Sequence, residues 1–165
     1  MDRRQVLADR IKKAFQETTH PGYGNVVEPG FACDTERIEV ANLYASVAWS
    51  ELSFGFVDSA RWTVSFLTSQ GFRYYLPAFL LGALHPRGGD VLDSVLYRLR
   101  APAWRSLSLE DWAQGMDGFS REQRDVIAEF LQWCKDHEDA FIRRDAAAAL
   151  ATYWDHGRLT FGEHE

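Results

Sequence analysis

The stretch Leu67-Thr68-Ser69-Gln70-Gly71-Phe72-Arg73-Tyr74-Tyr75-Leu76-Pro77-Ala78-Phe79-Leu80-Leu81-Gly82-Ala83-Leu84 decides the fold of this chain. Its second half, from Tyr74 to Leu84, contains no charged residue, and Thr68 is placed to cap a helix that starts after it. This apolar run is about half of the roughly 20 residues that a membrane-spanning helix needs, so we expect a helix buried in a protein core. Pro77 lies inside the pattern and has no backbone N–H, which predicts that the helix is kinked or divided there.

Apolar residues recur at helical spacings of three and four on both sides of this core segment. The segments with this spacing are residues 7–18, 35–48, 91–99, 126–134 and 146–154. Ser120 and Gln123 are placed to form a capping box, and Ile38 starts the expected buried face of its segment. With a short helix after Ser108, these segments predict an all-α protein of six or seven helices around a central apolar helix. Residues 49–62 mix serine, glycine and aromatic residues with the alternating Leu52, Phe54 and Phe56, so a short strand and an ordered loop both remain open there.

Length and composition favour one soluble domain. The chain has 165 residues, of which 46% are hydrophobic and 25% are charged, as in ordinary globular proteins. We expect a single helical domain over residues 1–157 and a flexible tail over residues 158–165. Cys33 and Cys134 lie far apart without a Cys-x-x-Cys spacing, and the first residues lack the apolar stretch of a secretory signal. Both observations predict a reduced, cytoplasmic protein.

Charge is distributed unevenly along the chain, whose net charge is −6. Residues 17–60 carry seven acidic groups and one basic group, and residues 106–165 carry thirteen acidic groups against six basic ones. The other two segments, 1–16 and 61–105, are basic. Because Lys and Arg supply most of the non-specific affinity for a phosphate backbone, this balance argues against nucleic-acid binding. It favours a basic protein as the partner.

The sequence contains no recognisable catalytic or cofactor-binding motif. Its five histidines have no metal-ligand spacing, and it lacks a nucleophile elbow, a P-loop and a dinucleotide-binding glycine motif. Asp34, Glu36 and Glu39 form the densest carboxylate group outside the last third of the chain. Helix capping explains Asp34 and a solvated face explains the glutamates, although the same group suits a metal ion or a partner surface. We therefore predict no catalytic residue, no cofactor and no metal, and lean against an enzyme.

Aromatic residues are concentrated between residues 49 and 79. Core packing is the default explanation, and a concave ligand pocket is the alternative. Tyr74 and Tyr75 are adjacent, so on a helix their side chains point about 100° apart and one hydroxyl is able to face a cavity or a partner. The candidate partner or ligand surface comprises Asp34, Glu36, Glu39, Trp49, Tyr74 and Tyr75.

Three motifs give the chain a resemblance to a bacterial protein family. They are Leu-Thr-x-x-x-Phe-x-Tyr-Tyr-Leu-Pro-Ala-Phe-Leu at residues 67–80, Phe-Ser-x-Glu-Gln-Arg at 119–124 and Ala-Leu-x-x-Tyr-Trp at 149–154. In this order they resemble a family of small bacterial proteins that is defined as a domain of unknown function. The resemblance implies a bacterial, self-contained helical domain, and it transfers no catalytic residue.

Three functions remain open from the sequence. The preferred hypothesis is a protein-binding module of an immunity-like or regulatory kind, because the chain is small, acidic and without a catalytic constellation. One alternative is a small-molecule-binding protein or enzyme that uses an aromatic pocket with acidic residues. The other is a self-associating structural protein, such as a homodimer held together by exposed aromatic residues.

Overall fold

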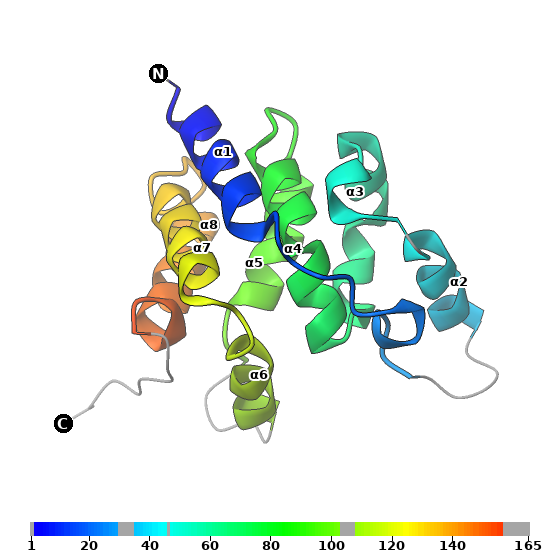
Figure 1. Ribbon diagram of the computed structural model, residues 1–165. Coiled ribbons are helices and arrows are strands. Elements are labelled where there is room, and N and C mark those ends of the chain that lie inside the picture. The colour runs from blue at the N-terminus through cyan, green and yellow to red at the C-terminus, as the bar shows by residue number, and fades with distance from the viewer. Residues whose placement is uncertain (1, 30–34, 46, 103–107, 157–165) are drawn as a thin grey trace. The chain divides into compact units, whose positions relative to one another are not determined.

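The computed structural model describes residues 2–29, 35–45, 47–102 and 108–156, which form eight α-helices (Figure 1). The described residues contain no β-strand, apart from one isolated antiparallel bridge between Val27 and Leu67. The all-α prediction is therefore confirmed. Contacts divide the chain into two compact units: unit 1 comprises residues 1–14 and 96–165, and unit 2 comprises residues 15–95. The single domain over residues 1–157 stays a prediction, and the predicted tail lies outside the described residues.

Helix α4 (Ser69–Leu84) is the core helix of unit 2 and corresponds to the apolar run of the sequence. It begins as predicted, because the Thr68 side chain accepts a hydrogen bond of 2.9 Å from the backbone N–H of Gly71. Twelve of its sixteen residues are buried, so the helix is covered around nearly its whole circumference. Pro77 lies inside one continuous helix, which decides against a division at this residue.

Unit 2 also contains α2 (Thr35–Tyr44), α3 (Phe54–Ala60) and the first part of α5 (Gly89–Leu99). Helix α3 corrects the reading of residues 49–62, which are neither a strand nor a loop. A 3₁₀ turn (Trp49–Glu51) leads into α3, and a second one (Arg61–Phe66) follows it. Ser53 caps α3 by accepting a hydrogen bond of 3.2 Å from the N–H of Phe56. The alternation of Leu52, Phe54 and Phe56 suggested a strand. The Ser53 cap and the burial of Val57 and Ala60, three residues apart, stabilise a helix instead.

One close backbone contact joins the start of α4 to the segment before α2. The N–H of Glu28 donates to the carbonyl of Phe66 at 2.9 Å, and the N–H of Thr68 donates to the carbonyl of Val26 at 3.0 Å. Gly71 faces this contact: a Cβ atom at Gly71 would lie 2.1 Å from the carbonyl oxygen of Val26. The contact therefore requires a residue without a side chain at this position.

In unit 1, α1 (Arg3–Phe15) runs antiparallel to α7 (Arg121–Cys134). The register follows from three contacts that progress in opposite directions along the two helices. Arg3 pairs with Asp136 at 2.6 Å, Arg10 pairs with Glu129 at 2.5 Å, and Gln123 Nε2 donates to the carbonyl of Ala14 at 3.4 Å. Ser120 and Gln123 form the predicted capping box at the start of α7. The ion pairs show the register but contribute little stability, since exposed pairs are worth about 0–1 kcal/mol.

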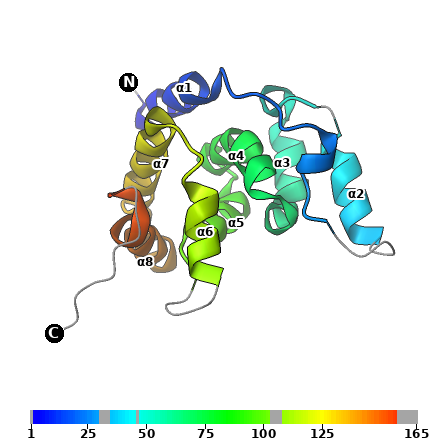
Figure 2. The ribbon, with the colours of Figure 1, turned by 60° about the horizontal axis from the view of Figure 1, so that its bottom comes forward.

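Helix α8 (Ala140–Ala149) and the π-helical turn that follows it (Leu150–Trp154) pack against α7, and α7 and α8 lie side by side in both views (Figures 1 and 2). Two tryptophans donate hydrogen bonds to backbone carbonyls at the end of α5. Trp112, on α6 (Ser108–Met116), donates its indole N–H to the carbonyl of Arg98 at 3.0 Å. Trp154 donates to the next carbonyl, that of Leu99, at 2.8 Å. These bonds satisfy carbonyls that a helix end leaves without an intrahelical partner.

Among the described residues, no helix combines the length and the apolar composition required to cross a membrane.

Candidate functional site

The aromatic half of the predicted surface lies in the core of unit 2. Trp49, Tyr74 and Tyr75 expose only 7%, 6% and 0% of their surface. The Tyr44 ring lies 4.5 Å from the Tyr75 ring and is itself fully buried. These exposures agree with the core-packing interpretation of the three aromatic residues, and they leave little of Tyr74 or Tyr75 accessible to a partner.

Hydrogen bonds within the core occupy the Tyr75 hydroxyl. It donates to the carbonyl of Val47 at 2.7 Å and lies 3.1 Å from His20 Nε2. Because its proton points to Val47, we assign the proton of His20 to Nε2, and His20 Nδ1 then accepts from the N–H of Gly22 at 3.0 Å. Burial, and to a lesser degree the neighbouring Tyr74, raises the pKa of Tyr75 above its usual value, so the hydroxyl stays neutral. These hydrogen bonds join His20 and Tyr75 in one network within unit 2.

The acidic half of the predicted surface is exposed. Glu36 and Glu39 lie on α2 with their side chains in solvent, and neither has an ion-pair partner among the described residues. Asp34, the third member of the carboxylate group, lies outside the described residues. The structure therefore keeps the two glutamates available to a partner and separates them from the buried aromatic residues.

Apolar side chains accompany these glutamates on the exposed side of α2. Ile38 is 54% exposed and Leu43 is 41% exposed, whereas Val40 and Tyr44 are buried. Ile38 therefore does not start the buried face as expected, because the buried side of α2 runs through Val40 and Tyr44. At 100° per residue the exposed side chains Glu36, Ile38, Glu39 and Leu43 span an arc of about 160°, and we call them the α2 face.

Two further exposed aromatic residues border the α2 face. Tyr23 is 54% exposed and donates its hydroxyl to the side chain of Asn42 on α2 at 2.9 Å. Trp62 is 46% exposed and packs edge-on against Phe66, whose ring also carries the guanidinium of Arg37 at 5.3 Å. In both ribbon views α2 lies at an edge of unit 2 (Figures 1 and 2). Single exposed apolar residues are ordinary, but a group of them beside unpaired carboxylates is typical of an interaction surface.

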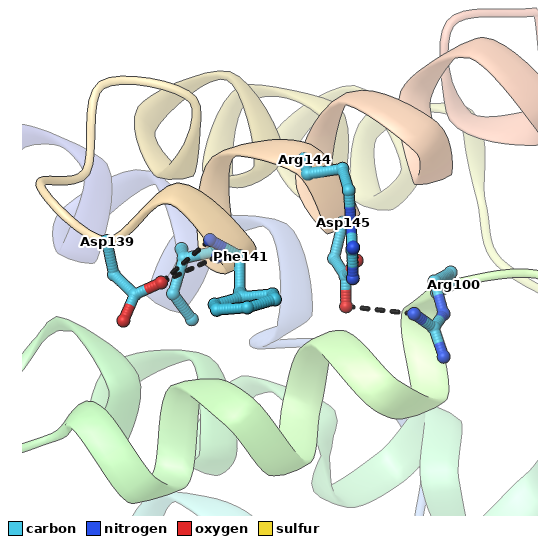
Figure 3. A network of polar contacts seen from close by, with 6 residues as sticks. Arg100, Asp139, Phe141, Arg144 and Asp145 are labelled. Atoms are coloured by element: carbon cyan, nitrogen blue, oxygen red, sulfur yellow. Dashed lines mark hydrogen bonds and ion pairs between the residues drawn. The ribbon is translucent and has the colours of Figure 1, made fainter.

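Unit 1 carries the other two large apolar residues that are exposed in the described part of the chain. They are Tyr97 on α5, which is 68% exposed, and Phe141 on α8, which is 69% exposed. The end of α5 is joined to α8 by an ion pair of 2.9 Å between Arg100 and Asp145 (Figure 3). Tyr97 lies about one helical turn before Arg100, and Phe141 about one turn before Asp145. Both aromatic residues therefore flank the same junction of helices.

Two arginines, Arg100 and Arg144, lie at this junction. Asp145 pairs with two guanidinium groups, because Arg100 contacts Oδ2 at 2.9 Å and Arg144 contacts Oδ1 at 3.0 Å. The Arg144 guanidinium also lies 5.2 Å from the Phe141 ring and is 65% exposed (Figure 3). Asp139 is occupied as the N-cap of α8, where it accepts from the N–H groups of Phe141 and Ile142. We call Tyr97, Arg100, Phe141 and Arg144 the arginine face.

Unit 1 also contains a groove of about 460 Å³ between α1 and the start of α7. Its charged lining residues have both signs: Arg10, Lys13 and Arg121 are basic, and Glu122 and Asp125 are acidic. All five are exposed, so the groove offers no desolvated polar group to orient a small ligand. In the described part of the chain, no group of three or more His, Cys, Asp and Glu residues is arranged to hold a metal ion.

Sequence reasoning did not single out Tyr97 and Phe141, although their positions in the apolar pattern indicate exposure. Tyr97 falls outside the apolar spacing of its own helix, which runs through Val91, Val95 and Leu99. A large aromatic side chain off the apolar face of an amphipathic helix points toward solvent or a partner. The same reasoning applies to Phe141, which precedes the buried face of α8 formed by Ile142 and Ala146.

The fold and these surfaces define an all-helical protein with two exposed surfaces that combine charged and apolar side chains. The chain belongs to the family described as Family of unknown function (DUF6714), whose profile matches residues 3–158. This match confirms the resemblance to a domain of unknown function that the motifs indicated. Searches of curated proteins and of solved structures gave no significant match.

Proposed function

We propose that this protein is a protein-binding module whose α2 face recognises a basic, partly apolar surface of another protein. One observation carries the proposal: Glu36 and Glu39 are exposed and unpaired within the described residues, and they stand beside the exposed side chains of Ile38 and Leu43. Apolar side chains supply a contact that can be desolvated, and carboxylates around them select the sign of the partner.

The charge around the α2 face supports a basic partner. Residues 17–60 carry seven acidic groups and one basic group, so the sequence that contains α2 is strongly negative. The one basic side chain of this segment, Arg37, rests on the ring of Phe66. A surface of this kind accelerates the approach of a cationic protein, and the acceleration falls steeply as salt is added.

The alternative of an aromatic ligand pocket is weakened by the closed packing in unit 2. Trp49, Tyr74 and Tyr75 are buried, the rings of Tyr74 and Tyr75 lie 4.8 Å apart, and the Tyr75 hydroxyl is occupied by Val47 and His20. The cytoplasmic location and the immunity-like or regulatory role remain parts of this proposal. A buried free thiol at Cys134 is compatible with a reducing compartment.

The test uses a synthetic amphipathic peptide of leucine and lysine as a defined basic probe. The wild-type protein is compared by titration calorimetry with a variant that carries Glu36→Gln, Glu39→Gln and Leu43→Ser. We expect affinity for the peptide to fall by about tenfold or more, since each 1.4 kcal/mol of lost interaction is a factor of ten. A control with Glu110→Gln and Glu138→Gln has the same two-charge change at exposed positions outside the α2 face. Equal losses in both variants would show that binding depends only on net charge, and would refute the proposal.

A photocrosslinking residue at Leu43, compared with one at exposed Gln132 on α7, extends the test to natural partners. We expect adducts at Leu43 that disappear when Glu36 and Glu39 are neutralised, and we expect the crosslinked partner segment to be basic. Adducts that persist after neutralisation, or partner segments that are acidic, would contradict the proposed recognition.

A further inference from the structure

The arginine face of unit 1 has the composition that the α2 face requires in a partner. Its two aromatic residues, Tyr97 and Phe141, are about two-thirds exposed. Beside them, two guanidinium groups share the single carboxylate of Asp145. The side chain of Arg144 is 65% exposed, so its donors can reach a second carboxylate in solvent. The surface therefore combines an apolar anchor with two guanidinium groups that share one ion-pair partner.

We infer that the arginine face is a docking site for the α2 face of a second copy of this chain. The inference rests on the proposed function, and it names the partner of that site. Glu36 and Glu39 lack ion-pair partners within the described residues, whereas the guanidinium groups of Arg100 and Arg144 outnumber their carboxylate. Leu43 and Ile38 match the exposed rings of Tyr97 and Phe141 in apolar character. Each chain thus carries both halves of one complementary contact.

The overall charge does not prevent this contact at physiological salt. Two copies of net charge −6 repel each other at long range. At about 0.15 M salt the Debye length is about 8 Å, so most of this repulsion is screened, while groups within about 4 Å of one another still interact. Raising the salt further weakens the contact between the carboxylates and the arginines. Moderate salt is therefore the condition that favours association.

Because the two faces differ, the contact is head-to-tail. A dimer made in this way leaves one α2 face and one arginine face unoccupied, so association continues with concentration unless a ring closes. Each face consists of about four principal side chains, which places the contact among the small, transient interfaces. We therefore expect weak association that depends on concentration, and not a permanent dimer.

Sedimentation velocity on the full-length protein tests the inference at concentrations from about 5 to 500 µM, which bracket a weak contact. We expect the average mass to rise with concentration, and to fall back toward the monomer when the salt is raised to about 0.5 M. Wild-type protein that stays monomeric over this whole range would overturn the inference.

Two variants identify the faces. The first carries Glu36→Gln, Glu39→Gln and Leu43→Ser, and the second carries Phe141→Ser and Arg144→Gln. All of these side chains are exposed, and circular dichroism checks that both variants fold. We expect each variant alone to be monomeric, and an equimolar mixture to form a heterodimer that does not grow further, because only one intact pair of faces remains.

Mixing the two variants distinguishes the contact between the α2 face and the arginine face from any other contact between copies of the chain. Association of either variant alone at the wild-type level, or a mixture that stays monomeric, would overturn the head-to-tail contact. The calorimetric titration with the leucine–lysine peptide keeps the two ideas apart. If the wild-type protein is monomeric but still binds the peptide through Glu36 and Glu39, the self-association fails and the proposed function stands.

Discussion

Replacing Gly71 by alanine gives a sharp test of how unit 2 is assembled. Gly71 lies in the first turn of α4, where the chain crosses the backbone of residues 26–28. An added Cβ would lie 2.1 Å from the carbonyl oxygen of Val26 and 2.9 Å from its carbonyl carbon. Both obstacles are backbone atoms, so no rotation of a side chain can relieve the overlap. The segment before α2 has to move away from α4.

Two opposing effects decide the size of the change. Alanine favours a helix over glycine by at most about 1 kcal/mol. Against this, overpacking costs about 1–3 kcal/mol, and each displaced hydrogen bond of the contact costs about 1 kcal/mol more. The bond from the N–H of Thr68 to the carbonyl of Val26 is the first to be lost, because that carbonyl is the obstacle. We expect a net loss of about 2 kcal/mol in the free energy of unfolding.

Urea and thermal unfolding followed by circular dichroism measure this loss, and about 2 kcal/mol corresponds to a fall in Tm of about 4–8 °C. Gly55→Ala is the matched control. Gly55 also lies in the first turn of a helix, α3, but a Cβ there would meet only the Ser53 hydroxyl at 3.9 Å. We expect this control to gain up to about 1 kcal/mol from helix propensity. If the two substitutions changed stability equally, the steric argument at Gly71 would be refuted.

Three further predictions follow from the hydrogen bonds and pKa shifts. Trp154→Phe removes the donor to the Leu99 carbonyl at the end of α5, and we expect a loss of about 1–3 kcal/mol in urea unfolding; an unchanged midpoint would show that water replaces the indole. Tyr75→Phe leaves the Val47 carbonyl without its 2.7 Å donor, and a similar loss is expected, whereas equal stability would argue against the assigned network. Burial is the main cause that raises the folded-state pKa of three tyrosines. The same tyrosines therefore ionise in the unfolded chain first, as the pH passes about 10. Their contribution to the free energy of unfolding is fully present below this pH and is lost as the pH rises above it. These tyrosines are Tyr44, Tyr75 and Tyr153. Phenolate absorbance during alkaline titration should show them ionising only as the protein unfolds; six tyrosines that titrate together before unfolding would contradict it.

Local signals in the sequence were sufficient for most of the helices. Thr68 and Ser120 cap α4 and α7 as their positions indicated, because a hydroxyl next to free N–H groups acts over a few residues only. Helix α3 was missed because its seven residues hold too little helical periodicity to outweigh the alternation of Phe54 and Phe56 in its first turn. The sequence likewise did not predict that α4 continues through Pro77. A proline that breaks an isolated helix is tolerated when the packing around it is dense.

The sequence also predicted the exposure of only some of the candidate site residues. The two glutamates of α2 are where an acidic, solvated helix face was expected. Tyr74 and Tyr75 are both buried although they point in different directions, because α4 is covered on nearly all sides. Ile38 is exposed although it is apolar, because Val40 and Tyr44 take the buried side of α2. Which side of a helix is covered depends on its neighbours and not on its own residues.

The sequence by itself determined that this protein is helical, where most helices start, that α4 is a core helix and that the surface is rich in carboxylates. These properties depend on backbone capping, apolar spacing and net charge, which act over one or two helical turns or on the whole chain at once. Only the tertiary structure decided that Trp49, Tyr74 and Tyr75 are all buried, that Tyr97 and Phe141 flank an arginine-rich junction, and that α2 presents apolar side chains beside its glutamates. The physical reason is that exposure is a property of neighbouring elements, and residues far apart in the chain become neighbours only when it folds.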